Sequence, residues 1–367
     1  MVGEEGEGDA RSPVLFCERL TITQTFVYCR SNLNESRAEM VTIKDIAKQA
    51  GVTYGTVSRA LNGEPGVSEK TRSRIKAIAE QMNYVPNLAA KRMVDRSSNC
   101  IGIIWPKIEG LFFYRLSERI QEEASRRGIR IMLSVAEPED ALSSFQEHFI
   151  DKVVHWVYSE QTAAFIAAKQ SFPGTILEVG SRSAGEGPSL EIDRKGAVFK
   201  AVRHLAELGH ERIAFVGART DKWVGYTQGL VDFDREYHPD DIVMTRLSDP
   251  DMEAKILGYL SRDRNDRATA VIVDSQGMMF EFARLVHAAK VRIPEQLSLV
   301  GYDDVPELHR LLPVSITTVG PDIDTLANRL MDTITRADAA EDSTDRNDRI
   351  IEGVLTVRES TQPPFGM

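Results

Sequence analysis

Cysteine is scarce in this chain. The 367 residues include three cysteines, Cys17, Cys29 and Cys100, and no two of them form a CxxC pair. A small, odd number favours a reducing, cytoplasmic compartment over a framework of disulfides. The histidines do not follow the spacing of metal ligands either. We therefore predict neither a disulfide scaffold nor a metal site.

Long apolar runs are also missing. No stretch of eighteen apolar residues occurs, so the sequence predicts no membrane-spanning helix and no membrane partner. Segment 13–29 interrupts its apolar residues with Glu18, Arg19 and Gln24, which makes it a poor signal-peptide core. Residues 1–39 begin rich in Gly and Glu and show no clear amphipathic period. We expect a poorly structured N-terminal extension there, which a start codon at Met40 would leave out of the native protein.

Common catalytic motifs are absent as well. The sequence contains no GxSxG, no P-loop and no HExxH. Gly185 and Gly187 are followed by Pro188 and lack the third glycine and the helix of a dinucleotide-binding fingerprint. An enzyme is therefore a weak interpretation, and no cofactor is predicted.

What the chain does contain is an uneven distribution of charge. Its 42% hydrophobic and 27% charged residues are typical of a soluble globular protein, and 367 residues allow more than one core. The formal net charge is −10, yet residues 40–98 hold ten Lys and Arg against five Asp and Glu. A basic segment on an acidic body is typical of a protein that binds nucleic acid.

The basic segment also carries a helical pattern. Thr42 and Asp45 form a variant of a capping box, and Gly51 ends the helix that they begin. Thr53 starts a second short helix over 54–61, and Ser68 starts a third. Two short helices joined by a three-residue turn with glycine are a helix-turn-helix signature. The pattern alone favours DNA binding, with a solvated three-helix domain as the alternative.

The same segment resembles the DNA-binding head of the lactose-repressor family (LacI/GalR-type regulators). The resemblance lies in the runs Val-Thr-Ile-Lys-Asp-Ile-Ala at 41–47, Ala-Gly-Val-Thr at 50–53 and Thr-Val-Ser-Arg at 56–59, and in Asn-Tyr-Val-Pro-Asn at 83–87. It implies a helix-turn-helix DNA-binding domain over 40–86 and a hinge helix and linker over 87–98. It also implies a dimeric, cytoplasmic transcriptional repressor with a double-stranded DNA operator as partner.

Within the head and hinge, the resemblance implies a set of DNA contacts. Tyr54 and Arg59 are expected on base edges, because arginine can grip guanine O6 and N7 together; the alternative for Arg59 is a phosphate contact. Gly55 offers no side chain and costs the helix about 1 kcal/mol relative to alanine. Met93 is expected to be the apolar wedge in the minor groove. The full set is Thr42, Tyr54, Gly55, Ser58, Arg59, Asn62, Ser68, Thr71, Tyr84, Asn87, Ala90 and Met93.

From residue 99 the pattern changes to alternating strands and helices. Such alternation predicts an α/β region, 99–360, with parallel sheets covered on both faces. Ligands bind at the carboxyl ends of such strands. The runs at 204–217 and 293–304 resemble the family's ligand-binding and dimerisation domain, which is similar to periplasmic sugar-binding proteins. The resemblance implies two lobes, about 99–192 with a return near 323–335, and about 193–320, and a last strand near 350–357. A solute-binding protein without a DNA role is the alternative.

The resemblance also points to an effector site between the lobes. In the family an arginine three residues before a glycine usually anchors the effector; before Gly229 this position is Tyr226. Ser275 and Gln276 stand where the family has Asn-Asp. These departures predict a small-molecule effector that is larger or partly apolar, such as a glycoside, an oligosaccharide or a modified sugar, or no small ligand. The candidate contacts are Phe112, Arg182, Asp193, Lys222, Trp223, Tyr226, Gln276 and Asp303.

Overall fold

The computed structural model describes residues 41–84, 99–105, 111–157, 161–180, 187–310, 312–336 and 346–364. The chain divides into two compact units, Met1–Asn87 and Leu88–Met367. We call residues 41–84 the head and the described residues from Asn99 on the regulatory unit. The extension 1–39, the hinge at 87–98 with Asn87, Ala90 and Met93, and Arg182 lie outside the described residues.

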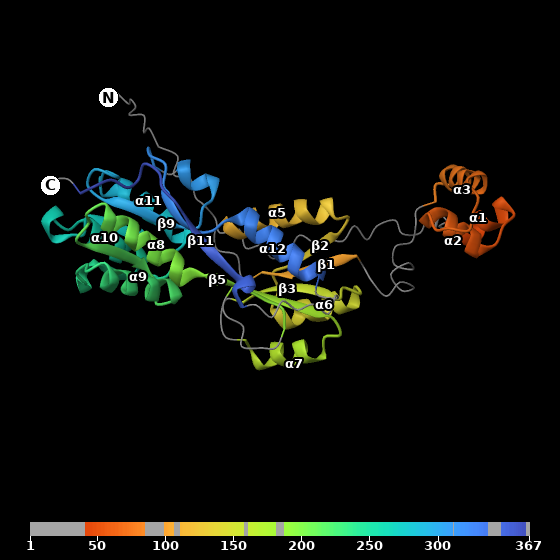
Figure 1. Ribbon diagram of the computed structural model, residues 1–367, viewed down its shortest axis with the longest axis horizontal. Coiled ribbons are helices and arrows are strands. Elements are labelled where there is room, and N and C mark those ends of the chain that lie inside the picture. The colour runs from red at the N-terminus through yellow and green to blue at the C-terminus, as the bar shows by residue number, and fades with distance from the viewer. Residues whose placement is uncertain are drawn as a thin grey trace, which may run out of the picture. The chain divides into compact units, whose positions relative to one another are not determined.

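The head is a three-helix domain. Its helices are α1 (Ile43–Ala50), α2 (Tyr54–Asn62) and α3 (Glu69–Gln81), as the capping pattern predicts (Figure 1). The Asp45 carboxylate accepts hydrogen bonds from the N–H of Thr42, at 2.9 Å, and from its hydroxyl, at 2.6 Å. Gly51 ends α1 with a φ of 61°, a backbone conformation that glycine adopts without strain. The first helix and turn are therefore specified locally.

A small apolar core holds the three helices together. Ile46, Val57, Ala60 and Ile75 are fully buried, and Ala79 is nearly so. They come from all three helices at helical spacing, so each helix presents one apolar stripe to the centre. The opposite faces of the helices are left to solvent and carry most of the charge.

The regulatory unit contains one sheet in two halves. The order of its strands is β2-β1-β3-β4-β5-β11-β10-β9-β8-β6-β7. All neighbours are parallel except β10 and β11. The first half contains β1 (Cys100–Ile104), β2 (Arg130–Ser134), β3 (Lys152–Val157), β4 (Thr175–Gly180) and β5 (Ser189–Asp193). The second contains β6 (Ile213–Gly217), β7 (Ile242–Met244), β8 (Ala270–Val273), β9 (Ser298–Tyr302) and β10 (Thr317–Pro321).

The strand β11 (Ile350–Thr356) joins the two halves. Its residues 350–352 pair with β5, and its residues 353–356 pair with β10. The chain also passes between the halves from β5 into a helix of the second half, and from β10 into a helix of the first. These three crossings confirm the two-lobed, periplasmic-binding-protein-like architecture that the resemblance implies.

Helices cover both faces of each half (Figure 1). In the first lobe, α5 (Phe112–Arg126) and α12 (Ile323–Arg336) pack on one face, and α6 (Pro138–Glu147) and α7 (Ala163–Ser171) on the other. In the second lobe, α8 (Arg194–Glu207) and α9 (Asp221–Asp232) cover one face, and α10 (Met252–Leu260) and α11 (Gln276–Ala288) the other. No helix of the described chain is long and apolar enough to cross a membrane.

The sequence pattern did not predict four elements, β5, β7, β10 and α10. The strands β5 and β7 are short, with five and three residues, and β5 alternates buried and half-buried positions. A short strand has too few residues for its period to stand out from the surrounding loop. The strand β7 is the edge of the second lobe's half of the sheet.

Candidate DNA-binding surface and effector site

The helix α2 presents two different faces. Val57 and Ala60 are fully buried against α1 and α3. On the other side the structure brings together five predicted residues at helical spacing, which we call the reading stripe: Tyr54, Gly55, Ser58, Arg59 and Asn62. Tyr54 is 55% exposed, although a tyrosine that served only packing would be largely covered. Tyr54, Arg59 and Asn62 are exposed, and Gly55 and Ser58 between them are half-buried, so the reading stripe forms one row along a short helix.

Arg59 is an exposed residue of the reading stripe. Its Nε donates to the backbone oxygen of Gly55 at 3.3 Å, which aligns the side chain along the helix. Beside it, the amide of Asn62 donates to the hydroxyl of Ser58 at 3.4 Å. These contacts are within one helix, so the stripe does not depend on distant parts of the chain for its order.

Other basic residues of the head have structural duties. Arg72 donates to the backbone oxygens of Ala60, at 3.3 Å, and Glu64, at 2.8 Å, beyond the last turn of α2. Arg74 donates to the backbone oxygen of Ala50 at 2.7 Å, at the end of α1. Cations satisfy the last carbonyls of a helix and interact well with its dipole. Sequence reasoning missed these roles; for Arg72 the available signal was its place three residues before the buried Ile75.

The remaining predicted head residues serve as caps or lie at the edge of the core. Ser68 accepts the backbone N–H of Thr71 at 3.3 Å, and their hydroxyls are 2.9 Å apart. Thr42 is exposed and bonded to Asp45, and its hydrogen bonds lower the pKa of that carboxyl. Tyr84 packs against the head's core. These residues are not part of the reading stripe.

In the second lobe, four residues meet where β8 and β9 end, and we call them the carboxyl-end cluster: Lys222, Asp274, Tyr302 and Asp303. The Lys222 ammonium donates to the backbone oxygen of Asp274 at 2.5 Å and lies 3.6 Å from the centre of the Tyr302 ring. A buried ammonium over an aromatic face gains a cation–π interaction. The cluster is located where open α/β sheets bind their ligands.

Burial shifts the ionisation of this cluster. It lowers the pKa of Lys222, although Asp303 and Asp274 oppose that shift. It raises the pKa of Asp303 to about 6, against the attraction of Lys222 and Arg194. It also raises the pKa of Asp274, whose carboxylate accepts the N–H of Ala218 at 2.9 Å. The cluster is therefore a set of desolvated, mutually dependent polar groups.

Among the described residues, three contacts between the lobes are relevant to this cluster. The side-chain oxygen of Gln276 accepts the backbone N–H of Leu111 at 2.5 Å. Arg115 of the first lobe forms an ion pair with Glu307 of the second. Arg194, which sequence reasoning missed, donates to the backbone oxygen of Gly180 at 2.9 Å. Its place directly after Asp193 at the crossing between lobes was the available signal.

The structure relocates two aromatic candidates into the core. Tyr226 is fully buried, and its hydroxyl donates to the backbone oxygen of Ile213 at 2.7 Å. Trp223 packs beside it, with ring centres 5.3 Å apart. Tyr226 is not retained as an effector contact, because its ring belongs to the apolar core under α8 and α9, whereas Trp223 is half-buried at the edge of that core. Phe112 is likewise 6% exposed, in a first-lobe cluster with Trp156, 5.9 Å away between ring centres.

The burial of Tyr226 shows that another residue must occupy the anchoring position. Lys222, and not Tyr226, lies in the carboxyl-end cluster, and Lys222 itself stands three residues before a glycine, Gly225. A Cβ on Gly225 would lie 2.2 Å from the backbone oxygen of Lys195, so α9 and α8 approach too closely there for any side chain. The sequence analysis counted three residues back from Gly229 and reached Tyr226. Counted back from Gly225, the anchoring position is Lys222, so the predicted loss of a cation there was wrong.

Asp193 acts as a helix cap in this structure. Its carboxylate accepts the N–H of Gly196 at 2.7 Å at the start of α8. Asp303 lies in the cluster, while the next residue, Asp304, pairs with Arg358 at 2.7 Å. Of the eight predicted effector residues, the structure therefore places Lys222 and Asp303 in the carboxyl-end cluster and Gln276 beside it at the junction of the lobes.

Comparison with known proteins agrees with both units. Residues 42–87 match the model of the bacterial regulatory proteins of the lacI family, and residues 202–361 match that of a periplasmic-binding-protein-like domain. Catabolite control protein A of Priestia megaterium is 27% identical over 311 residues, covering 79% of this chain and 91% of that protein. The ribose operon repressor of Bacillus subtilis is 27% identical over 299 residues, covering 78% and 88%.

A solved structure extends the likeness to the fold as a whole. The lac repressor dimer bound to operator and the anti-inducer ONPF superposes with a TM-score of 0.75 at 20% identity, over 88% of this chain and 99% of that one. The chain belongs to the lacI family of bacterial regulatory proteins. It is a DNA-binding transcriptional regulator and not an enzyme. The interpretation as a solute-binding protein without a DNA role is thereby set aside.

Proposed function

We propose that this regulator represses transcription by binding a pseudo-palindromic operator as a homodimer, and that a small molecule bound beside the carboxyl-end cluster controls it. Because its ligand is chromosomal DNA, we place it in the cytoplasm. The reading stripe on α2 is the observation that supports the DNA contact most directly, since its polar side chains face solvent in one row. A two-fold dimer reads two half-sites of opposite orientation.

Within this proposal the head residues have different roles. Tyr54 and Arg59 read base edges, and Ser58 and Asn62 support them from the same helix. Thr42, Ser68 and Thr71 contact phosphates near helix N-termini, where N–H groups favour anions. Tyr84 and Asn87 lead into the hinge, where Ala90 permits close approach to the DNA and Met93 wedges between bases.

Selection of bound sequences from a random DNA library, with the full chain, tests the operator. We expect two inverted half-sites, and we expect Met93→Ala to reduce bending and affinity while Met93→Leu retains both. A single unrepeated site, or equal bending by Met93→Ala, would count against the proposal. The wild-type and variant heads should unfold at the same temperature, since Met93 is outside the head.

The first lobe offers a face for the dimer. The strand β2 is the edge of the sheet, and it leaves Leu133 47% exposed. Val135, just beyond β2, is 62% exposed, and Tyr114 near the start of α5 is 53% exposed. Apolar side chains gathered at a sheet edge are typical of an interface. We expect light scattering to give the mass of a dimer for the wild type and of a monomer for Leu133→Glu, with the exposed Ile166→Glu of α7 as control.

The effector proposal rests on unmatched polar atoms. In the described part of the chain, the buried Gln276 side-chain nitrogen and the buried Tyr302 hydroxyl have no hydrogen-bond partner. A buried polar atom without a partner costs about 1–3 kcal/mol, which a ligand that bonds to it would recover. Together with Lys222 and Asp303 these atoms suit a polyhydroxylated molecule. The half-buried Phe113, 5.0 Å from Trp156 between ring centres, offers an apolar surface nearby.

We therefore propose a glycoside, an oligosaccharide or another modified sugar as effector, rather than a free monosaccharide. A thermal-shift screen of the full chain tests this, because a ligand at a hundred times its Kd stabilises a protein by about 2.7 kcal/mol. Gln276→Leu should abolish the shift, while Gln228→Leu, an exposed glutamine of α9, should preserve it. A clear shift with free glucose, galactose or ribose that Asp303→Ala removes would refute this choice of ligand.

A further inference from the structure

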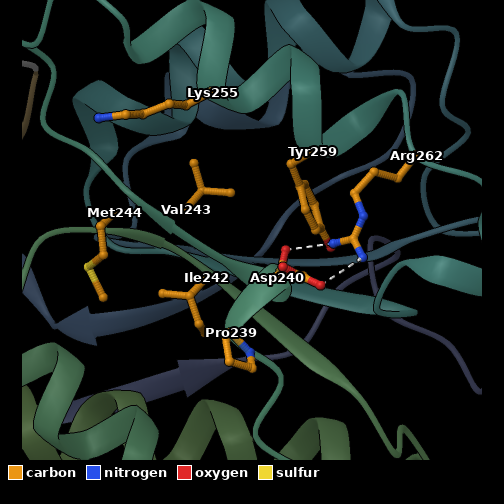
Figure 2. Close-up of a pocket in the computed structure, with 8 residues that line it drawn as sticks. All are labelled: Pro239, Asp240, Ile242, Val243, Met244, Lys255, Tyr259 and Arg262. Carbon is orange, nitrogen blue, oxygen red and sulfur yellow. Dashed lines mark hydrogen bonds and ion pairs between the residues drawn. The ribbon is translucent and has the colours of Figure 1, made fainter.

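We propose that the second lobe holds another small-molecule site, on its outer edge, that takes a carboxylic acid with an apolar body. A cavity of about 600 Å³ lies between β7 and α10 (Figure 2). The carboxyl-end cluster contributes no residue to its lining. The two sites are therefore separate, and this inference does not depend on the effector proposed above.

The cavity follows the open edge of the sheet. The strand β7 pairs with β6 alone, so its other side has no neighbouring strand. Ile242 and Met244 pack toward the core under α8 and α9, whereas Val243 belongs to the core on the opposite face. All three line the cavity, which gives it an apolar wall that follows the edge of the strand, with Val243 on one face and Ile242 and Met244 on the other (Figure 2).

Tyr259 of α10 supplies a buried donor to this cavity. It is 4% exposed, yet its hydroxyl has no hydrogen-bond partner among the residues that the structure describes. Buried hydroxyl groups nearly always have a partner, as Tyr226 has in the same lobe. An unsatisfied hydroxyl in the lining of a cavity points to an acceptor that a ligand brings.

The cation Arg262 indicates that this acceptor is negatively charged. Its guanidinium donates to the backbone oxygen of Asp240 at 2.6 Å and lies 3.6 Å from the buried carboxylate of Asp241, whereas the carboxylate of Asp240, 84% exposed, is 3.9 Å away. An exposed ion pair at that distance is weak, so a ligand carboxylate can replace it. In Figure 2 the side chains of Tyr259 and Arg262 lie side by side at one end of the apolar wall. A carboxylate there accepts from both, while an aromatic or branched body lies against Val243, which belongs to the same apolar cluster as Tyr259.

Titration of the full chain with 3-phenylpropionate and its uncharged amide tests the site. We expect saturable binding of the acid and at least about tenfold weaker binding of the amide, since a hydrogen bond to a charged group contributes more than one to a neutral group. Tyr259→Phe removes only the hydroxyl and should weaken binding of the acid about tenfold. Its unfolding temperature should equal or exceed that of the wild type, because the phenylalanine leaves no unsatisfied group.

The control is Ser143→Ala, which removes an exposed hydroxyl from α6 of the first lobe. This variant should bind 3-phenylpropionate as the wild type does. Absence of saturable binding, equal affinity for acid and amide, or unchanged affinity in a folded Tyr259→Phe would each overturn the proposal.

Discussion

The head and the regulatory unit build their candidate sites in opposite ways. The reading stripe lies within nine residues of one helix, and its side chains bond to groups of the same helix, Arg59 to the backbone oxygen of Gly55 and Asn62 to the hydroxyl of Ser58. The carboxyl-end cluster joins Lys222 of α9 with groups that follow β8 and β9, far away in the sequence. A local site stays ordered wherever its helix stays folded. A dispersed site depends on the packing of the whole lobe, so it can respond to a ligand.

Charge is used differently as well. In the head, Arg72 and Arg74 satisfy helix ends, and Arg59 is left on the surface. In the regulatory unit Lys222 and Asp303 are half-buried among other groups, and the loss of water around their charges shifts both pKa values toward the neutral forms. Surface charges act on a partner at long range, whereas buried charges act on one another. Four predictions test this contrast.

The largest effect should come from the head's small core. Ile75 is fully buried in it, and removing its methylene and methyl groups costs about 2–5 kcal/mol. Few other residues support this core, so Ile75→Ala should unfold the head and abolish DNA binding while the regulatory unit still melts as in the wild type. Calorimetry measures the unfolding of the head and of the regulatory unit, and a gel-shift assay measures DNA binding. Loss of both transitions together would contradict the independence of the two units, and the exposed Lys76→Ala should change neither.

A smaller loss is expected for Arg59→Ala, at about 1–3 kcal/mol per half-site, with relaxed preference at one base position. Affinities for a panel of single-base operator variants measure it. Lys48→Ala, an exposed cation of α1, is the matched control and should weaken all sequences evenly if it contacts DNA at all. If Arg59→Ala also weakens all sequences evenly, Arg59 is a phosphate contact.

The third prediction concerns pH and the regulatory unit. The folded-state pKa of Asp303 is raised from 3.8 to about 6, so the protonated group favours folding. That contribution is present below about pH 4 and is lost as pH rises through about 6. Asp303→Asn cannot ionise, and asparagine tolerates the φ of 68° at this position. Relative to the wild type, the variant should gain on the order of 1–2 kcal/mol of stability between pH 4 and pH 7.

Denaturant titrations at several pH values measure this difference. The control is Asp304→Asn, whose carboxylate forms a surface-accessible pair with Arg358. A constant difference between wild type and Asp303→Asn from pH 4 to pH 7 would show that the buried carboxyl does not ionise in this range.

The smallest expected effect is a gain in the stability of the head. Gly55 lies inside α2, and a Cβ there would meet only the Arg59 guanidinium, at 3.8 Å. Gly55→Ala should therefore stabilise the head by up to about 1 kcal/mol. If operator affinity falls although the head is more stable, the glycine is needed for close approach to DNA. If affinity is unchanged, glycine at this position only widens the set of tolerated bases.

Much of this molecule could be predicted from its sequence. Helix boundaries in the head followed from Thr42, Thr53, Ser68 and Gly51, because caps act over three or four residues and their partners are close in the chain. The alternation of strands and helices predicted the α/β class, because the period of each element is visible within a short stretch of sequence. The reading stripe could also be predicted from the sequence, because helical spacing alone brings Tyr54, Ser58 and Asn62 to one face.

The tertiary structure alone decided which candidates meet in the regulatory unit. Spacing allowed either Tyr226 or Lys222 at the anchoring position, and only the packing of α9 on α8 turns Tyr226 into the core and Lys222 toward Asp274. The bond between Gln276 and Leu111 across the lobes, the cap at Asp193 and the unmatched hydroxyl of Tyr259 depend likewise on segments that the sequence does not place near one another. Local rules extend over one turn of a helix, and contacts between distant segments are fixed only when the whole chain folds.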